Sequence, residues 1–221
     1  MGRGIWLTVV AVRGVPWWGV ISSAAAPVLL IGGWTVAAGL QPRSFNPVAE
    51  TISALAAQDA ADRWVMTSAL LATGACYVTT ALALWLAAAP GRLVLITGGT
   101  ATALVAANPE PAGSGSLPHT ICAAAAFVAM ALWPALARAR GPCVPWGLRP
   151  AVCATATALI LVLLAWFYTE LGAGDRQLGL AERVLAGAQV LWPLAVVLTC
   201  YRSQPHTRAP TAGPASASTH S

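Results

Sequence analysis

The stretch Ala151–Leu171 reads AVCATATALILVLLAWFYTEL, and its only charged residue is Glu170, next to its end. An α-helix rises about 1.5 Å per residue, so about 20 apolar residues cross the hydrocarbon core of a bilayer, which is about 30 Å thick. The stretch is that long and almost entirely apolar. It therefore predicts a membrane-spanning α-helix.

Similar apolar stretches recur along the chain and predict further spanning helices. They cover residues 17–40, 64–89, 93–107, 117–137 and 184–201. The span 93–107 is short, so we expect it inside the bundle or in thinned lipid. Composition agrees, because 57% of residues are hydrophobic and only 9% are charged, whereas soluble domains are about 25% charged. We expect an all-α membrane protein, with a six-helix transmembrane bundle over residues 17–202.

The two ends of the chain lie outside this bundle. Residues 1–16 predict a short interfacial lead-in, not a signal peptide, because Arg13 interrupts their apolar run and a helix follows at once. Residues 203–221 are rich in Pro, Ser, Thr and Ala and have almost no large apolar side chains. Such a segment cannot bury enough surface to fold, so we expect a disordered cytoplasmic tail.

The arginines predict the orientation, since cytoplasmic loops of membrane proteins are enriched in basic residues. With the N-terminus inside, eight arginines are cytoplasmic and four (43, 63, 176 and 183) are outside, together with every acidic residue. This favours an N-in/C-in, multi-pass protein of the plasma membrane. The basic residues are scattered and form no stripe, which argues against a nucleic-acid partner.

The loop between the first two spans, residues 41–63, has an amphipathic pattern. Val48, Ile52 and Leu55 recur at helical spacing, with the acidic residues off that stripe. This spacing predicts a short helix lying on the outer membrane interface.

The candidate chemistry centres on the residues that start the fourth span and end the fifth. Ser116 is expected to cap the fourth helix, whose free N–H groups could then hold an anion such as a lipid phosphate. His119 could act as a general base or acid, or simply form a hydrogen bond to a neighbouring loop. Glu170 could orient His119 or bind a cation, but pairing with Arg63 or Arg183 is favoured, because charges at a membrane edge usually pair.

The remaining charged residues near the spans predict anchoring more than chemistry. Asp62-Arg63 and Glu182-Arg183 precede or open helices and are interpreted as interfacial anchors. The absence of a charge deep in any predicted span argues against an ion-coupled transporter. No CxxC or HExxH pattern is present, and two of the three histidines lie in the tail, so no metal or cofactor is predicted. The residues expected in an outer-face polar cluster are Asn46, Ser53, Arg63, Asn108, Ser116, Glu182 and Arg183.

Several short motifs, in this order and spacing, carry a family resemblance. They are Asn46-Pro47, Thr51-Ile52-Ser53, Arg63-Trp64 with Gly74, Asn108-Pro109 before His119, Trp166, and Gly179-Leu180-Ala181-Glu182-Arg183. Over residues 16–202 the chain resembles the bacterial six-span membrane proteins grouped as domain of unknown function 998, which are distantly similar to Frag-type and DRAM-type proteins. The resemblance implies a six-helix bundle and no particular activity or catalytic residue. The distant relatives make membrane lipids the favoured partner.

Three functions stay open from the sequence. The first is an envelope membrane protein that binds lipid or a membrane-protein partner at its outer face. The second is a lipid-modifying enzyme, an acyl hydrolase or transferase, with His119 as base and Glu170 orienting it. The third is a small transporter. The first, without catalysis, is favoured, because the sequence has no recognisable active-site motif. We expect the function at the outer face, where the varied polar side chains lie.

Overall fold

The computed structural model describes residues 14–112, 115–174 and 176–204, and six long helices dominate it. Their bounds are α1 Trp17–Leu40, α2 Trp64–Ala83, α3 Ala89–Ala107, α4 Leu117–Ala137, α5 Pro150–Ala173 and α6 Leu178–Arg202. Two short 3₁₀ helices, η1 (Ser53–Ala56) and η2 (Trp146–Leu148), complete the described part, which contains no strand. All six long helices are apolar enough to cross a membrane. The predicted all-α, six-helix membrane fold is confirmed.

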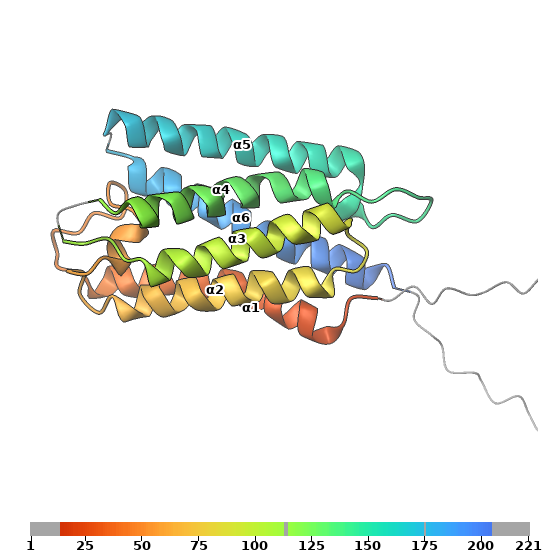
Figure 1. The fold of residues 1–221 in the computed structure, drawn as a ribbon, viewed down its shortest axis with the longest axis horizontal. Coiled ribbons are helices and arrows are strands. Elements are labelled where there is room, and N and C mark those ends of the chain that lie inside the picture. The colour runs from red at the N-terminus through yellow and green to blue at the C-terminus, as the bar shows by residue number, and fades with distance from the viewer. Residues whose placement is uncertain (1–13, 113–114, 175, 205–221) are drawn as a thin grey trace, which may run out of the picture.

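The helices run antiparallel to their sequence neighbours and form a layered bundle (Figure 1). α1, α2, α3 and α4 pack in sequence order, α6 lies against α1, and α5 lies against α4 and α6. We call the end where α1, α3 and α5 finish the polar end. At the opposite end the Gln204 side chain donates a hydrogen bond to the Val15 carbonyl over 3.1 Å, so the two described chain ends meet there. The N-in/C-in orientation stays a prediction, since the packing is the same for either orientation.

The lead-in expected over residues 1–16 and the tail expected over 203–221 lie almost wholly outside the described residues. The described residues 14–16 have no regular structure and lead directly into α1, which begins at the expected Trp17.

The break between α2 and α3 comes earlier in the sequence than expected. The second span was expected to continue to Ala89, but α2 ends at Ala83, and α3 begins at Ala89 with Pro90 in its first turn. Proline lacks an N–H and disfavours a helical conformation in the residue before it, so it suits the first turn of a helix and not an unbroken helix end. The third span is accordingly longer than the sequence suggested.

The sixth helix also begins before its expected start at Val184. α6 starts at Leu178, so Glu182 lies within the helix and is only 4% exposed. The interpretation of Glu182 as an interfacial anchor was therefore wrong. Glu182 is nevertheless close to the start of α6, at the polar end, and does not lie deep in the spanning part of the helix.

The loop after α1 does not form the expected interfacial helix. Its helical part is only η1, and Ile52 and Leu55 are 4% and 0% exposed within the main apolar core. Val48 stays exposed. The apolar spacing thus reflects side chains that pack into the bundle at its polar end, not a helix lying on the membrane surface.

Small residues allow α2 and α3 to approach each other closely. A Cβ atom on Gly74 would lie 2.5 Å from the Gly99 carbonyl oxygen, and one on Gly99 would lie 2.7 Å from that of Gly74. Backbone atoms therefore meet directly at this point, as small residues permit in membrane bundles.

Helix α5 packs through a different apolar cluster from the other five long helices. The main apolar core joins α1 to α4 with α6, whereas Ile160, Leu164 and Phe167 of α5 belong to a smaller cluster with Ala131 of α4 and Leu185 of α6. α5 is therefore the peripheral helix of the bundle, as Figure 1 shows.

A hydrogen bond between α1 and α2 offers a test of polar contacts in this bundle. Ser22 Oγ and Thr80 Oγ1 are 3.0 Å apart and both side chains are buried. We expect a Ser22→Ala, Thr80→Ala double-mutant cycle to give a coupling free energy of about 0.6 kcal/mol, typical of interhelical hydrogen bonds in membranes. Unfolding in mixed micelles measures it. Exact additivity of the two single variants would contradict the expectation.

Candidate functional site at the polar end

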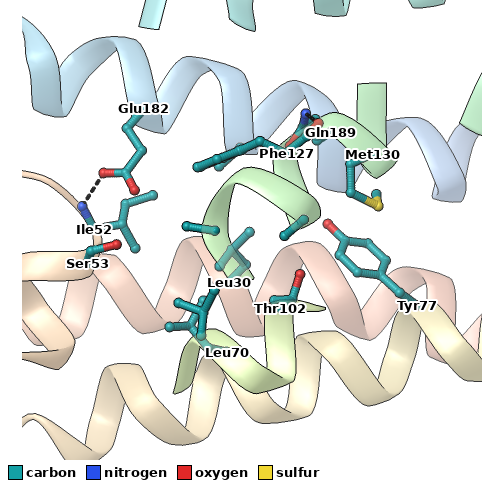
Figure 2. Close-up of a pocket in the computed structure, with 14 residues that line it drawn as sticks. Leu30, Ile52, Ser53, Leu70, Tyr77, Thr102, Phe127, Met130, Glu182 and Gln189 are labelled. Carbon is teal, nitrogen blue, oxygen red and sulfur yellow. Dashed lines mark hydrogen bonds between the residues drawn. The ribbon is translucent and has the colours of Figure 1, made fainter. Parts of the chain in front are cut away.

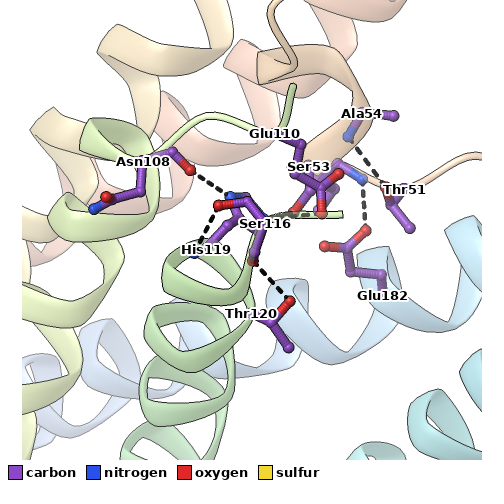
Figure 3. Close-up of polar contacts among 10 residues, drawn as sticks. Thr51, Ser53, Ala54, Asn108, Glu110, Ser116, His119, Thr120 and Glu182 are labelled. Carbon is purple, nitrogen blue, oxygen red and sulfur yellow. Dashed lines mark hydrogen bonds and ion pairs between the residues drawn. The ribbon is translucent and has the colours of Figure 1, made fainter. Parts of the chain in front are cut away.

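Three segments distant in sequence converge at the polar end: residues 46–53, the α3–α4 connection and the start of α6 (Figure 3). They contain most of the motif residues that carry the family resemblance. The convergence places a histidine, a serine and two carboxylates within one small region of the bundle.

His119 lies in the first turn of α4, where Ser116 caps the helix by accepting a hydrogen bond from the His119 backbone N–H. The His119 side chain is 3% exposed. Its Nδ1 lies 2.9 Å from the Asn108 carbonyl oxygen, and its Nε2 lies 3.1 Å from Ser53 Oγ. Glu110 Oε1 is 3.8 Å from the same Nε2, which is too long for a hydrogen bond but close enough for a charge interaction.

These contacts determine where the histidine proton lies. The Asn108 carbonyl can only accept, so Nδ1 must carry the proton. In the neutral imidazole Nε2 then has its lone pair free and accepts the hydrogen bond from Ser53 Oγ–H. The arrangement is that of a serine beside a base, with the base oriented by a third group.

Glu182 supports the serine from α6. Its Oε2 accepts a hydrogen bond of 2.5 Å from the Ile52 backbone N–H, directly before Ser53 and η1. A buried carboxylate needs such partners, because an uncompensated charge is costly away from water. Glu182 thereby fixes the backbone that presents Ser53.

The first turns of α6 also clamp the preceding part of the loop. Arg183 Nη1 lies 2.7 Å from the carbonyl oxygens of both Pro47 and Glu50, and the Leu180 N–H donates to the Val48 carbonyl over 2.9 Å. A Cβ atom on Gly179 would meet the Glu50 and Pro47 carbonyl oxygens, so only glycine fits this approach. Residues Gly179–Arg183 of α6 thus form the surface on which residues 47–52 pack.

Some predicted site residues are not part of this cluster. The Glu170 carboxylate accepts a hydrogen bond from Trp166 Nε1 over 3.0 Å, and its other oxygen is buried with no hydrogen-bond partner among the described residues. The Arg63 guanidinium lies 4.0 Å from the centroid of the Trp64 ring. The structure thus gives His119 and Glu170 different partners, and a role for Glu170 in orienting His119 has no contact to support it.

Asn46 contributes to the loop and not to the cluster around His119. Its side-chain oxygen accepts from the Val48 N–H over 3.0 Å, and its own N–H donates to Glu50 Oε1 over 2.8 Å. Sequence reasoning missed Glu110 and Thr51. Thr51 lies in a quoted motif and Glu110 directly follows Asn108-Pro109, but only the fold reveals that they adjoin His119 and Ser53.

A groove of about 300 Å³ opens beside this cluster, between α4 and α5. Its polar side is formed by Thr51, Ser53, Glu110, His119, Thr120 and Glu182. Its apolar side includes Phe127 and Phe167, whose ring centroids are 5.2 Å apart across the two helices. The groove therefore has one polar and one apolar side within the spanning part of the bundle.

A smaller cavity, about 60 Å³, lies inside the bundle (Figure 2). Ser53, Phe127 and Glu182 line both spaces. Deeper in, Tyr77 points its hydroxyl toward the cavity, and no residue that the structure describes accepts or donates a hydrogen bond to it. No cluster of three or more His, Cys, Asp or Glu side chains suited to a metal occurs among residues 14–112, 115–174 and 176–204.

Six apolar helices and a polar cluster at one end of the bundle define a multi-pass helical membrane protein. The chain belongs to the DUF998 family, since the family model described as "Protein of unknown function (DUF998)" matches residues 23–199. The resemblance seen in the motifs is thereby confirmed, while the distant similarity to Frag-type and DRAM-type proteins stays a prediction. No curated protein and no solved structure matches the chain.

Proposed function

We propose that this protein binds an amphipathic membrane lipid in the groove between α4 and α5, on the outer side of the plasma membrane. The observation that carries the proposal is a single groove with aromatic side chains on one side and the Ser53–His119–Glu182 cluster on the other. Because α4 and α5 are spanning helices, the medium around the groove is lipid. An acyl chain fits the apolar side, and the more polar linkage of a lipid fits the cluster.

The position of α5 supports lipid entry from the side. α5 is the most apolar of the six helices and the least buried. Its buried apolar contacts with α4 and α6 belong to the smaller apolar cluster, so fewer buried apolar side chains pack there than in the main core. The outer-side placement rests on the arginine distribution of the sequence.

Blocking the groove tests this proposal. Ala124 of α4 lines the groove, whereas the next residue, Ala125, is exposed on the same helix and lines none of the spaces described above. We expect Ala124→Trp to reduce photo-crosslinking of a diazirine-labelled phospholipid to the α4–α5 region by about tenfold, a change of about 1.4 kcal/mol in binding.

The matched control is Ala125→Trp, which adds the same side chain one position away and should crosslink like the unmodified protein. Peptide mapping by mass spectrometry locates the label. Equal labelling of both variants, or labelling spread evenly over the spanning helices, would show that the groove does not select a lipid.

A further inference from the structure

Ser53 and His119 are placed for a covalent step that lipid binding alone does not need. Ser53 Oγ lies 3.1 Å from His119 Nε2, and His119 Nδ1 lies 2.9 Å from the Asn108 carbonyl oxygen. Nucleophilic serines are activated in this way, by a base within hydrogen-bond reach that a third group orients. We propose that Ser53 is a nucleophile and His119 its general base in acyl transfer from an ester-linked lipid.

The proposal rests on the proposed lipid binding, because the groove brings the ester to the serine. Ser53 lines both the groove and the inner cavity, on the polar side of the groove and at one end of a mainly apolar cavity. A lipid whose acyl chain follows the apolar side has its ester linkage where the apolar part ends. That junction is at Ser53.

The first half of the reaction forms an acyl-serine. Ser53 Oγ attacks the ester carbonyl carbon while its proton moves to His119 Nε2. The new imidazolium lies 3.8 Å from the Glu110 carboxylate, which stabilises the positive charge. The ester C–O bond then breaks, and His119 returns the proton to the departing alcohol oxygen.

The second half uses water and regenerates the site. An open hollow of about 520 Å³, lined by Ala54 and Glu110, adjoins the cluster at the polar end. Water gives a proton to His119 Nε2 and attacks the acyl carbon, the bond to Ser53 Oγ breaks, and the proton passes to that oxygen. The products are a fatty acid and the lipid alcohol. An acceptor alcohol in place of water would give a new ester.

A hydrogen-bond donor for the developing oxyanion also lines the groove. Thr51 Oγ1 accepts from the Ala54 N–H over 3.1 Å, and its own proton has no acceptor among the described residues. The hydroxyl can therefore donate to a negatively charged oxygen beside Ser53. Asn108, which acts through its carbonyl on His119, is a positioning residue.

The test uses the full-length protein in lipid nanodiscs and an alkyl fluorophosphonate, which phosphonylates activated serines with loss of fluoride. We expect peptide mass spectrometry of the unmodified protein to find the adduct on Ser53. Ser53→Ala should lose it, while Ser44→Ala, an exposed serine of the same loop, should keep it. His119→Asn retains a donor toward the Asn108 carbonyl and lacks the base, so labelling should slow by about 10²–10⁴-fold.

A purely structural Ser53–His119 hydrogen bond predicts a different result. In that case the folded, unmodified protein carries no adduct on Ser53, or His119→Asn labels at the unchanged rate, and either outcome overturns the proposal. Release of fatty acid from phosphatidylglycerol in the nanodisc, lost in Ser53→Ala, would support it further.

Lipid photo-crosslinking of Ser53→Ala separates this proposal from the proposed function. If lipid still crosslinks to the groove but the fluorophosphonate never labels Ser53 of the unmodified protein, lipid binding is supported and the acyl-transfer reaction is contradicted. If the unmodified protein shows no crosslinking specific to the groove, the lipid-binding proposal itself is contradicted.

Discussion

Gly179→Ala is expected to destabilise the protein by about 1–3 kcal/mol, the usual cost of forcing atoms into a well-packed site. The added Cβ meets the carbonyl oxygens of Glu50 and Pro47, which are backbone atoms and cannot rotate away. Relief requires residues 47–50 to move off α6, which also lengthens the Arg183 contacts to the same two carbonyls. Thermal unfolding in detergent measures the loss, and limited proteolysis detects the released loop.

Gly187→Ala is the matched control in the same helix. Its added Cβ finds only the tip of Trp34, at 3.9 Å, which is ordinary contact. Replacing glycine by alanine inside a helix otherwise stabilises by about 0.5–1 kcal/mol. The two variants should therefore shift the unfolding midpoint in opposite directions. A shift of the same sign and size in both would mean that the approach of the loop to α6 is not tight.

Glu182→Leu and Glu182→Gln are expected to differ by about 1–3 kcal/mol, the cost of leaving a buried donor unsatisfied. Leucine removes the acceptor of the Ile52 N–H, whereas glutamine keeps an amide oxygen at the same place. Glutamine also removes a buried ionisable group, so its stability should equal or exceed that of the unmodified protein.

The same pair of variants separates structure from chemistry at this position. If Glu182→Gln folds normally but loses lipid crosslinking in the groove, the charge of the carboxylate matters for the ligand. The unfolding midpoint and the lipid crosslinking of both variants are measured in nanodiscs of the same lipid composition. Greater stability of the leucine variant than of the glutamine variant would contradict the role given to the Ile52 hydrogen bond.

The sequence predicts the helices best where apolar runs have clear local boundaries. α1 and α4 begin and end at the expected residues. Their starts have clear local signals, since Pro16 directly precedes α1 and Ser116 caps α4. α6 was placed too late because Glu182 and Arg183 have the composition of a membrane edge. Their partners, residues 47–52, lie more than a hundred positions earlier, and no local pattern indicates that a loop will satisfy them.

The candidate site shows the same limit. His119 and its Ser116 cap follow from local sequence, since a capping serine precedes an apolar run by a fixed spacing. The Ser53 partner does not, because it is 66 residues away and reaches His119 only through the folded loop. Glu170 was chosen as the orienting carboxylate on its expected membrane depth alone. Depth places residues at the same level without determining which side of the bundle they face.

The clamp between α6 and residues 47–52 has a consequence for biogenesis. The loop that presents Ser53 is synthesised early, but the residues that fix it, Gly179 to Arg183, are synthesised more than a hundred residues later. A nascent or truncated chain can insert its first helices while its serine and histidine remain unaligned. We therefore expect the loop that carries Ser53 to become fixed only after α6 has entered the bundle, so a chain that ends before Gly179 would lack the contacts that hold this loop.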